Sequence, residues 1–139
     1  TLHGVNFYTH GTQITAAHGH LSFYGAYVAL NLAMFTYAMP QLRGRAPYNQ
    51  VLNMASFWLM TGGMAFMTFT LTFAGTIQTH MQRIVGDYYM DVQDQLGLFY
   101  LMRFGSGVAA VLGALLFIYA MLVVRREVVQ PGPMTVPGE

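Results

Sequence analysis

Three long apolar segments, separated by polar ones, dominate the hydrophobic pattern of the chain. Each contains a stretch of at least 21 successive residues without Asp, Glu, Lys or Arg. A helix that crosses a hydrocarbon core of roughly 30 Å needs about 20 apolar residues. The pattern therefore predicts an all-α integral membrane protein with three transmembrane helices, at residues 12–39, 51–78 and 96–124.

The segments around these helices carry charged and turn-forming residues. Pro40 should end the first helix, because proline lacks the amide donor and restricts the residue before it. The predicted segments are a polar lead-in, a loop, a connector and a Pro/Gly-rich tail, at residues 1–11, 40–50, 79–95 and 125–139.

The arginines predict the orientation of the three helices. Arg43 and Arg45 lie in the first loop, Arg125 and Arg126 lie in the tail, and the connector has Arg83 alone. Short cytoplasmic loops carry the excess of Lys and Arg in membrane proteins. The loop and the tail should therefore be cytoplasmic. The lead-in and the connector should face the periplasm, across a bacterial inner membrane.

Composition excludes a soluble domain and several kinds of site. Of the 139 residues, 55% are hydrophobic and 8% are charged, whereas soluble domains carry about 25% charged residues. The chain has no cysteine, so a thiolate metal site is excluded. The net charge of +1 gives no indication of nucleic-acid binding. The start lacks a signal peptide and an initiator methionine, and three helices make a thin bundle, so we expect a piece of a larger assembly.

Small residues in the second and third apolar segments predict close helix packing. Gly and Ala at an interface let two helix backbones approach each other in a membrane. The candidates are Gly62, Gly63, Gly105, Gly107, Gly113, Ala109, Ala110 and Ala114.

Two histidines near the start of the first helix are the strongest chemical signal. His18 and His20 are separated by one residue, so in an α-helix they point about 200° apart and lie about 3 Å apart along the axis. They therefore cannot chelate one metal, but they can bind two metals on opposite flanks. Haem iron is commonly held by an axial histidine, and one helix between two haems would use both. A proton relay, a substrate-binding histidine or simple packing are the alternatives.

The sequence around these histidines resembles a known membrane family. "VNFYTHGTQITAAHGHLSFYGAYVALNLAMFTYAMPQL" is similar to the tenth transmembrane helix of the catalytic subunit of bacterial cytochrome c-dependent nitric oxide reductases. "YMDVQDQLGLFYLMRFGSGV" resembles the start of the last helix. The resemblance covers essentially the whole chain and implies the C-terminal three helices of a twelve-helix bundle. The wider haem–copper oxidase superfamily has a similar His-x7-His-x-His pattern, usually with Asp after the first histidine, where this chain has Gly11.

The resemblance implies roles for five residues. His18 matches the proximal ligand of the high-spin haem b3, and His20 matches one axial ligand of the low-spin haem b. His10 and Thr12 match residues beside the haem propionates. Arg83 falls where the superfamily keeps basic residues near propionates. The alternative is an arginine at the membrane–water interface that contacts no cofactor.

The family reaction, as implied by the resemblance, reduces two NO molecules to N2O and water during denitrifying respiration. It uses haem b, haem b3 and a non-haem iron whose ligands lie on helices outside this chain. The implied partners are the other helices of the catalytic subunit and a membrane-anchored cytochrome c subunit. The chain would thus be part of an oxidoreductase and not an enzyme alone. An oxygen-reducing oxidase subunit and a non-catalytic membrane subunit are the alternative functions.

Overall fold

A computed structural model of the chain describes residues 2–43 and 49–122, and every regular element in these two ranges is helical. The all-α prediction is therefore confirmed for this part of the chain. The predictions for Arg45, Arg125, Arg126 and the tail lie outside the described residues. The elements are α1 (His3–Thr9), α2 (Gln13–Phe23), η1 (Tyr24–Ala29), α3 (Leu30–Arg43), α4 (Gln50–His80), η2 (Met81–Val85), α5 (Tyr89–Gln95) and α6 (Gly97–Leu122).

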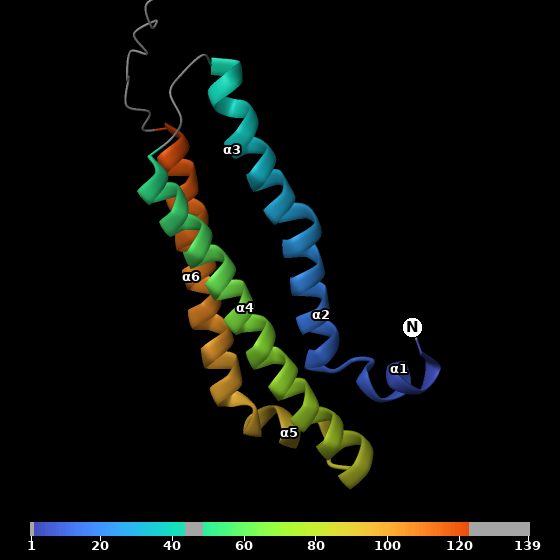
Figure 1. Cartoon of the computed structure of the whole chain (residues 1–139). Helices are drawn as coiled ribbons and strands as arrows, with labels where there is room; N and C mark the ends of the chain where they lie inside the picture. Colours follow the sequence, from blue (N-terminus) through green and yellow to red (C-terminus); the bar gives the residue numbers. More distant parts are fainter. Residues whose placement is uncertain (1, 44–48, 123–139) are drawn as a thin grey trace, which may run out of the picture.

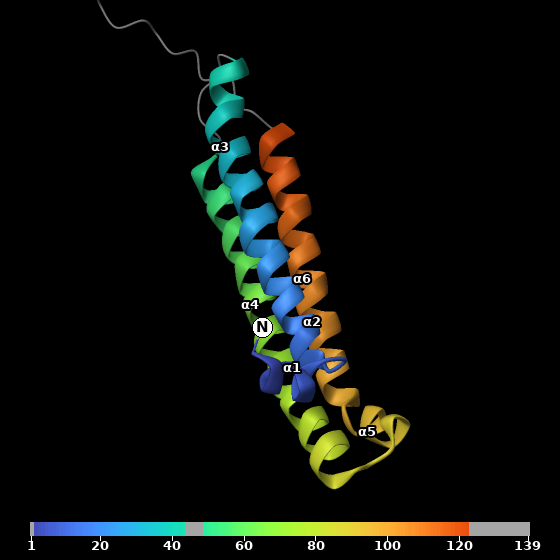
Figure 2. The ribbon, with the colours of Figure 1, turned by 90° about the vertical axis from the view of Figure 1, so that its right-hand side faces the viewer.

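Three long rods make up the molecule (Figure 1). The first rod runs from α2 through η1 into α3, the second is α4 with η2 at its end, and the third is α6. The short helices α1 and α5 lie at the same end of the bundle, at the bottom of both Figure 1 and Figure 2. This end holds the start of α2, so the predicted site residues of α2 lie beside the connector between α4 and α6.

A capped turn sets the start of α2. Gly11 has a φ of 76°, a conformation that an L side chain rarely adopts. Thr12 then serves as the N-cap: its hydroxyl accepts a hydrogen bond from the Ile14 amide at 3.3 Å. The lead-in at 1–11 stays a prediction as a separate segment. It is not irregular, however, since α1 occupies most of it.

Pro40 lies inside α3 and does not stop the first rod, so this prediction is wrong. Proline already has a helical φ, and what it removes is its own amide donor and some space beside the preceding turn. Here α3 ends at Arg43, less than one turn later. Inside a helix the proline removes a single backbone hydrogen bond, that of the missing amide.

A widened helical turn, η1, separates α2 from α3. The amide of Tyr24 is shared between the carbonyls of His20 and Leu21, and the six residues of η1 form a π-helix. A π-turn contains one more residue than an α-turn, so it shifts the faces that follow. In Figure 1 the lower part of the rod lies close to α4, and the upper part, α3, diverges from it.

The connector between the second and third rods is also mostly helical. The sequence predicts a connector at 79–95, but α4 continues to His80 and η2 follows directly. The chain reverses at Gly86, whose φ of 88° needs a glycine. α5 then leads into α6.

Close backbone packing joins α4 to α6, as some of the small residues predict. A Cβ on Gly63 would lie 2.9 Å from the Ser106 carbonyl oxygen, and one on Gly113 would lie 2.8 Å from the Met60 nitrogen. Both glycines are therefore interface residues. The prediction is wrong for Gly62, Gly105 and Gly107, where an added Cβ meets nothing within 4 Å, because these three lie on other faces of their helices.

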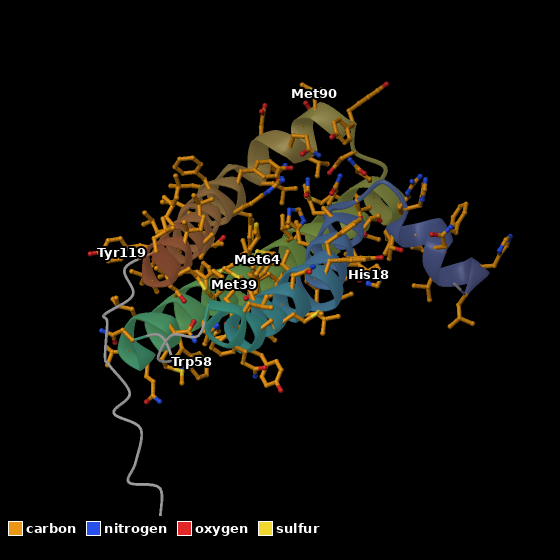
Figure 3. All side chains as sticks on the ribbon, turned by 90° about the horizontal axis from the view of Figure 1, so that it is seen from above. His18, Met39, Trp58, Met64, Met90 and Tyr119 are labelled. Atoms are coloured by element: carbon orange, nitrogen blue, oxygen red, sulfur yellow. The ribbon has the colours of Figure 1, made fainter. Side chains whose placement is uncertain are left out.

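Two of the described helices, Gln50–Val85 and Gly97–Leu122, are long and apolar enough to cross a membrane. Large apolar side chains cover their outer surfaces, for example Phe69 and Phe104 at 67% and 68% exposure. Trp58 and Tyr119 likewise lie on the outside of the bundle in Figure 3. Such a surface suits lipid or further helices. The third span and the twelve-helix bundle stay predictions.

Candidate functional site

His18 and His20 lie on α2, which is α-helical through Phe23. The two side chains therefore point about 200° apart around the helix axis, as expected for an α-helix. Ala17 is 2% exposed and packs against Met67 and Leu71 of α4. Relative to this buried position, His18 is rotated by about 100° to one side and His20 by about 60° to the other. The two imidazoles thus leave the helix on opposite flanks of its contact with α4.

The burial of the two histidines matches this arrangement. His18 is exposed and His20 is half-buried. Figure 3 shows His18 at the end of the molecule near α1, and Met39 far along the same rod. Each flank can therefore receive a separate group, at the same end of the bundle and at nearly the same depth.

A hydrogen bond defines the proton position on His20. Its Nδ1 lies 2.7 Å from the backbone carbonyl oxygen of Ala16. A carbonyl only accepts, so Nδ1 must carry the hydrogen and Nε2 presents a lone pair. Histidines that bind metals almost always hold the other ring nitrogen in this way, which fixes the ring orientation. The Nε2 lone pair of His20 is therefore the one that a metal ion could use.

Gly19 lies between the histidines, on the side of α2 away from α4. An added Cβ at this position meets nothing within 4 Å. The glycine leaves the helix backbone uncovered between the two flanks, so planar groups on either side could approach it closely.

Thr12 and His10 differ in what they can offer a ligand. Thr12 is 5% exposed, and its hydroxyl donates to the Thr9 carbonyl at 2.7 Å while accepting from Ile14. Its single proton is therefore used within the turn. His10, at the end of α1, is exposed, so its side chain is accessible to a group at this end.

Arg83 lies on η2, at the end of the bundle that also holds the start of α2 (Figure 1). Its side chain is exposed. A guanidinium can pair with a carboxylate through two parallel hydrogen bonds. The structure thus places a cation at the histidine end.

No group of three or more His, Asp or Glu side chains that could hold a metal occurs among residues 2–43 and 49–122. A porphyrin iron needs only one or two protein ligands, because the macrocycle supplies the other four. Isolated histidines such as His18 and His20 fit that kind of metal site and do not fit a site built wholly from side chains.

A partly buried polar cluster at the start of α2 was not predicted from the sequence. It consists of Gln13, Gln78, Gln93 and Tyr100, which we call the glutamine cluster. Gln78 is 1% exposed, although it lies near the end of a long apolar helix. A glutamine within an apolar segment could have indicated such a cluster from the sequence, since a buried amide needs hydrogen-bond partners.

A cavity of about 880 Å³ lies between α3 and α4, toward the other end of the rods. Its lining mixes polar side chains such as Thr36 and Asn53 with apolar ones such as Phe57 and Met60. It does not include His18 or His20, so it is separate from the candidate site.

Comparison with known proteins gives two findings. Residues 1–109 match the family described as cytochrome c and quinol oxidase polypeptide I. The chain is also 46% identical, over 128 residues, to a nitric oxide reductase subunit of Stutzerimonas stutzeri. That alignment covers 86% of this chain and 27% of the relative, so most of the relative's length lies outside the present chain.

Proposed function

The chain belongs to the cytochrome c and quinol oxidase polypeptide I family, and from this premise we propose that it forms one wall of the haem site in a nitric oxide reductase catalytic subunit. The observation that supports this most directly is the pair of imidazoles on opposite flanks of α2, one of them with its Nδ1 proton held by Ala16. Because the chain spans 27% of its relative, other helices must supply the remainder of the site.

His20 would bind the iron of the low-spin haem b. Its Nε2 lone pair is free, and the Ala16 carbonyl makes the imidazole a better donor by accepting the Nδ1 hydrogen. A second axial ligand from another helix would complete the coordination. The identity of the axial ligands is a main determinant of haem potential, so His20 would set the potential at which electrons pass through.

His18 would bind the iron of haem b3 from one face only. Its exposed imidazole leaves α2 on the other flank. The opposite face of that haem would be left to the substrate and to a non-haem iron bound by residues outside the chain. When bound, these groups supply the chemistry that reduces two NO to N2O and water.

The remaining site residues would act on the haem edges and not on the iron. His10 and Arg83 lie at the histidine end and would contact propionates, whereas Thr12 would hold the turn that precedes α2. The positive-inside argument favours the periplasmic surface of a bacterial inner membrane for this end. Electrons would then arrive from a membrane-anchored cytochrome c subunit on that side.

The test is the optical and electron paramagnetic resonance spectrum of the intact complex with either histidine replaced. His20→Ala should remove the low-spin haem signal, and His18→Ala should remove the high-spin one. Retention of both signals in either variant would rule out the assignment. His80→Ala is the matched control, because His80 is an exposed histidine outside α2 and should leave both signals intact.

An oxygen-reducing oxidase subunit is the second candidate, because the matching family is described by oxidases. Against it, Gly11 stands where the resemblance to the oxidases implies that an aspartate is usual. Elemental analysis of the intact complex distinguishes the two, since an oxidase would contain copper and the reductase only iron. A non-catalytic subunit would contain no haem at all.

A further inference from the structure

The first turn of α2 is held by a buried side chain of α4. The backbone amide of Gln13, the first residue of α2, donates to Oε1 of Gln78 at 2.9 Å. This amide is one of the helix-start donors that have no partner within the helix. Gln78 is 1% exposed, so the bond is shielded from competing water.

A glycine one turn away on α4 makes this approach possible. A Cβ on Gly75 would collide with the backbone nitrogen of Ile14 and would lie 2.9 Å from the carbonyl carbon of Gln13. Gly75 and Gln78 are three residues apart and so share a face of α4. Gly75 leaves room for the backbone of α2, and Gln78 accepts a hydrogen bond from it.

The Gln13 side chain extends the contact to two more helices. Its Nε2 donates to the Tyr100 hydroxyl of α6 at 3.2 Å, and that hydroxyl donates in turn to Oε1 of Gln93 on α5. The glutamine cluster therefore ties the start of α2 to α4, α5 and α6 at one point.

Between this first turn and the end of α2, the contact with α4 is only weakly directional, and the next hydrogen bond between the two rods, from Tyr24 Oη to Thr61 Oγ1 at 2.8 Å, follows in η1. In that contact Ala16 and Ala17 of α2 pack among the apolar side chains of Met64, Met67 and Leu71 of α4. Apolar burial is non-directional, whereas a hydrogen bond requires a narrow range of distance and angle. A slip of one residue would rotate every side chain of α2 by about 100°.

We propose that the glutamine cluster positions the haem-binding histidines. Gln78 is the central positioning residue: it fixes Gln13, and His18 and His20 follow at about 7.5 and 10.5 Å along the axis. The inference rests on the proposed function for the two histidines. It assigns to Gln78 no contact with haem, only control of where the imidazoles lie.

The experiment compares Gln78→Met with Gln78→Glu in the intact membrane complex. Methionine keeps the shape and removes the acceptor, so the low-spin resonance should shift and the midpoint potential of that haem should change while haem content is retained. A protonated glutamate keeps a carbonyl acceptor and should restore the wild-type values. Tyr100→Phe is the milder second variant, which removes one hydroxyl and should shift the same signals less.

Ser56→Ala is the matched control. Ser56 is also 1% exposed and also on α4, but near its other end. It should change neither the resonance nor the potential. An equal shift in Ser56→Ala, or unchanged signals in both Gln78→Met and Tyr100→Phe, would overturn the proposal.

A measurement that does not depend on haem separates this inference from the proposed function. Hydrogen–deuterium exchange at the Gln13 amide should become about tenfold faster in Gln78→Met. An unchanged exchange rate would mean that the hydrogen bond from the Gln13 amide to Gln78 does not hold the start of α2. Faster exchange together with an unaltered haem signal rejects the positioning role. Loss of all dependence of the haem signals on His18 and His20 would reject the proposed function instead.

Discussion

Gly75 of α4 lies directly against the backbone nitrogen of Ile14 in α2, with no room for a side chain between them. Gly75→Ala should therefore push the start of α2 away from α4. We expect a loss of about 1–3 kcal/mol in stability, the usual effect of overpacking, measured as a lower thermal unfolding midpoint of the detergent-solubilised complex.

Gly62→Ala provides the control for that change. Gly62 is on the same helix, but an added Cβ meets nothing within 4 Å. Alanine favours a helix over glycine by up to about 1 kcal/mol, so this variant should be neutral or more stable. Equal destabilisation by both changes would mean that the contact between Gly75 and Ile14 does not limit the packing.

The contact between α4 and α6 gives a second packing prediction. A Cβ on Gly63 would lie 2.9 Å from the Ser106 oxygen and 3.0 Å from the Ala110 nitrogen, both backbone atoms. Backbone cannot move aside as a flexible side chain can, so Gly63→Ala should force the two helices apart and lower the unfolding midpoint. Gly107→Ala, on an open face of α6, should not. A stable Gly63→Ala complex would contradict the close approach.

Thr12 provides a test between a structural and a cofactor role. Its hydroxyl is used by Thr9 and Ile14, so Thr12→Ala should destabilise the complex by about 0.5–2 kcal/mol, as loss of an N-cap does. Thr12→Ser should retain most of that stability. Haem potentials should be nearly the same in wild type and Thr12→Ser, which keeps the hydroxyl. A clear shift in Thr12→Ala without the expected loss of stability would show that the hydroxyl contacts a propionate and is not used for the cap.

Arg83 should raise the potential of a nearby haem, because a cation stabilises the reduced state relative to the oxidised one. Arg83→Gln should therefore lower the midpoint potential, by on the order of tens of millivolts. Arg83→Lys should retain much of the effect, since it keeps the charge. Redox titration of the intact complex checks both, and identical potentials in all three proteins would leave Arg83 as an interfacial residue.

The sequence predicted the rods well because uncharged stretches long enough to cross a membrane have few alternatives to a helix. It also predicted the opposed flanks of His18 and His20, since that angle depends only on helix geometry. The glutamine cluster could not be derived in the same way. Gln13 and Gln78 are 65 positions apart, and only the folded chain shows which buried amides meet.

Predictions from the local sequence failed at two irregular positions of the first rod, Pro40 and the π-helical turn η1. Pro40 is a strong helix terminator by its chemistry, yet it lies inside α3, where the loss of its one amide donor is tolerated. The π-turn η1 has no comparable signal in the residues that form it, YGAYVA. Its presence changes which later residues face α4, so the faces of α3 could not be assigned from a regular helical period.

The same widened turn has an evolutionary consequence. It begins where the carbonyl of His20 shares a hydrogen bond from Tyr24, so the part of the rod that carries the two histidines stops where the irregular part starts. We expect replacements, and even single-residue insertions, in α3 to be absorbed by that looser turn before they disturb the imidazoles. Natural variation could then remodel the far end of the rod to suit new neighbours while the redox end is inherited unchanged.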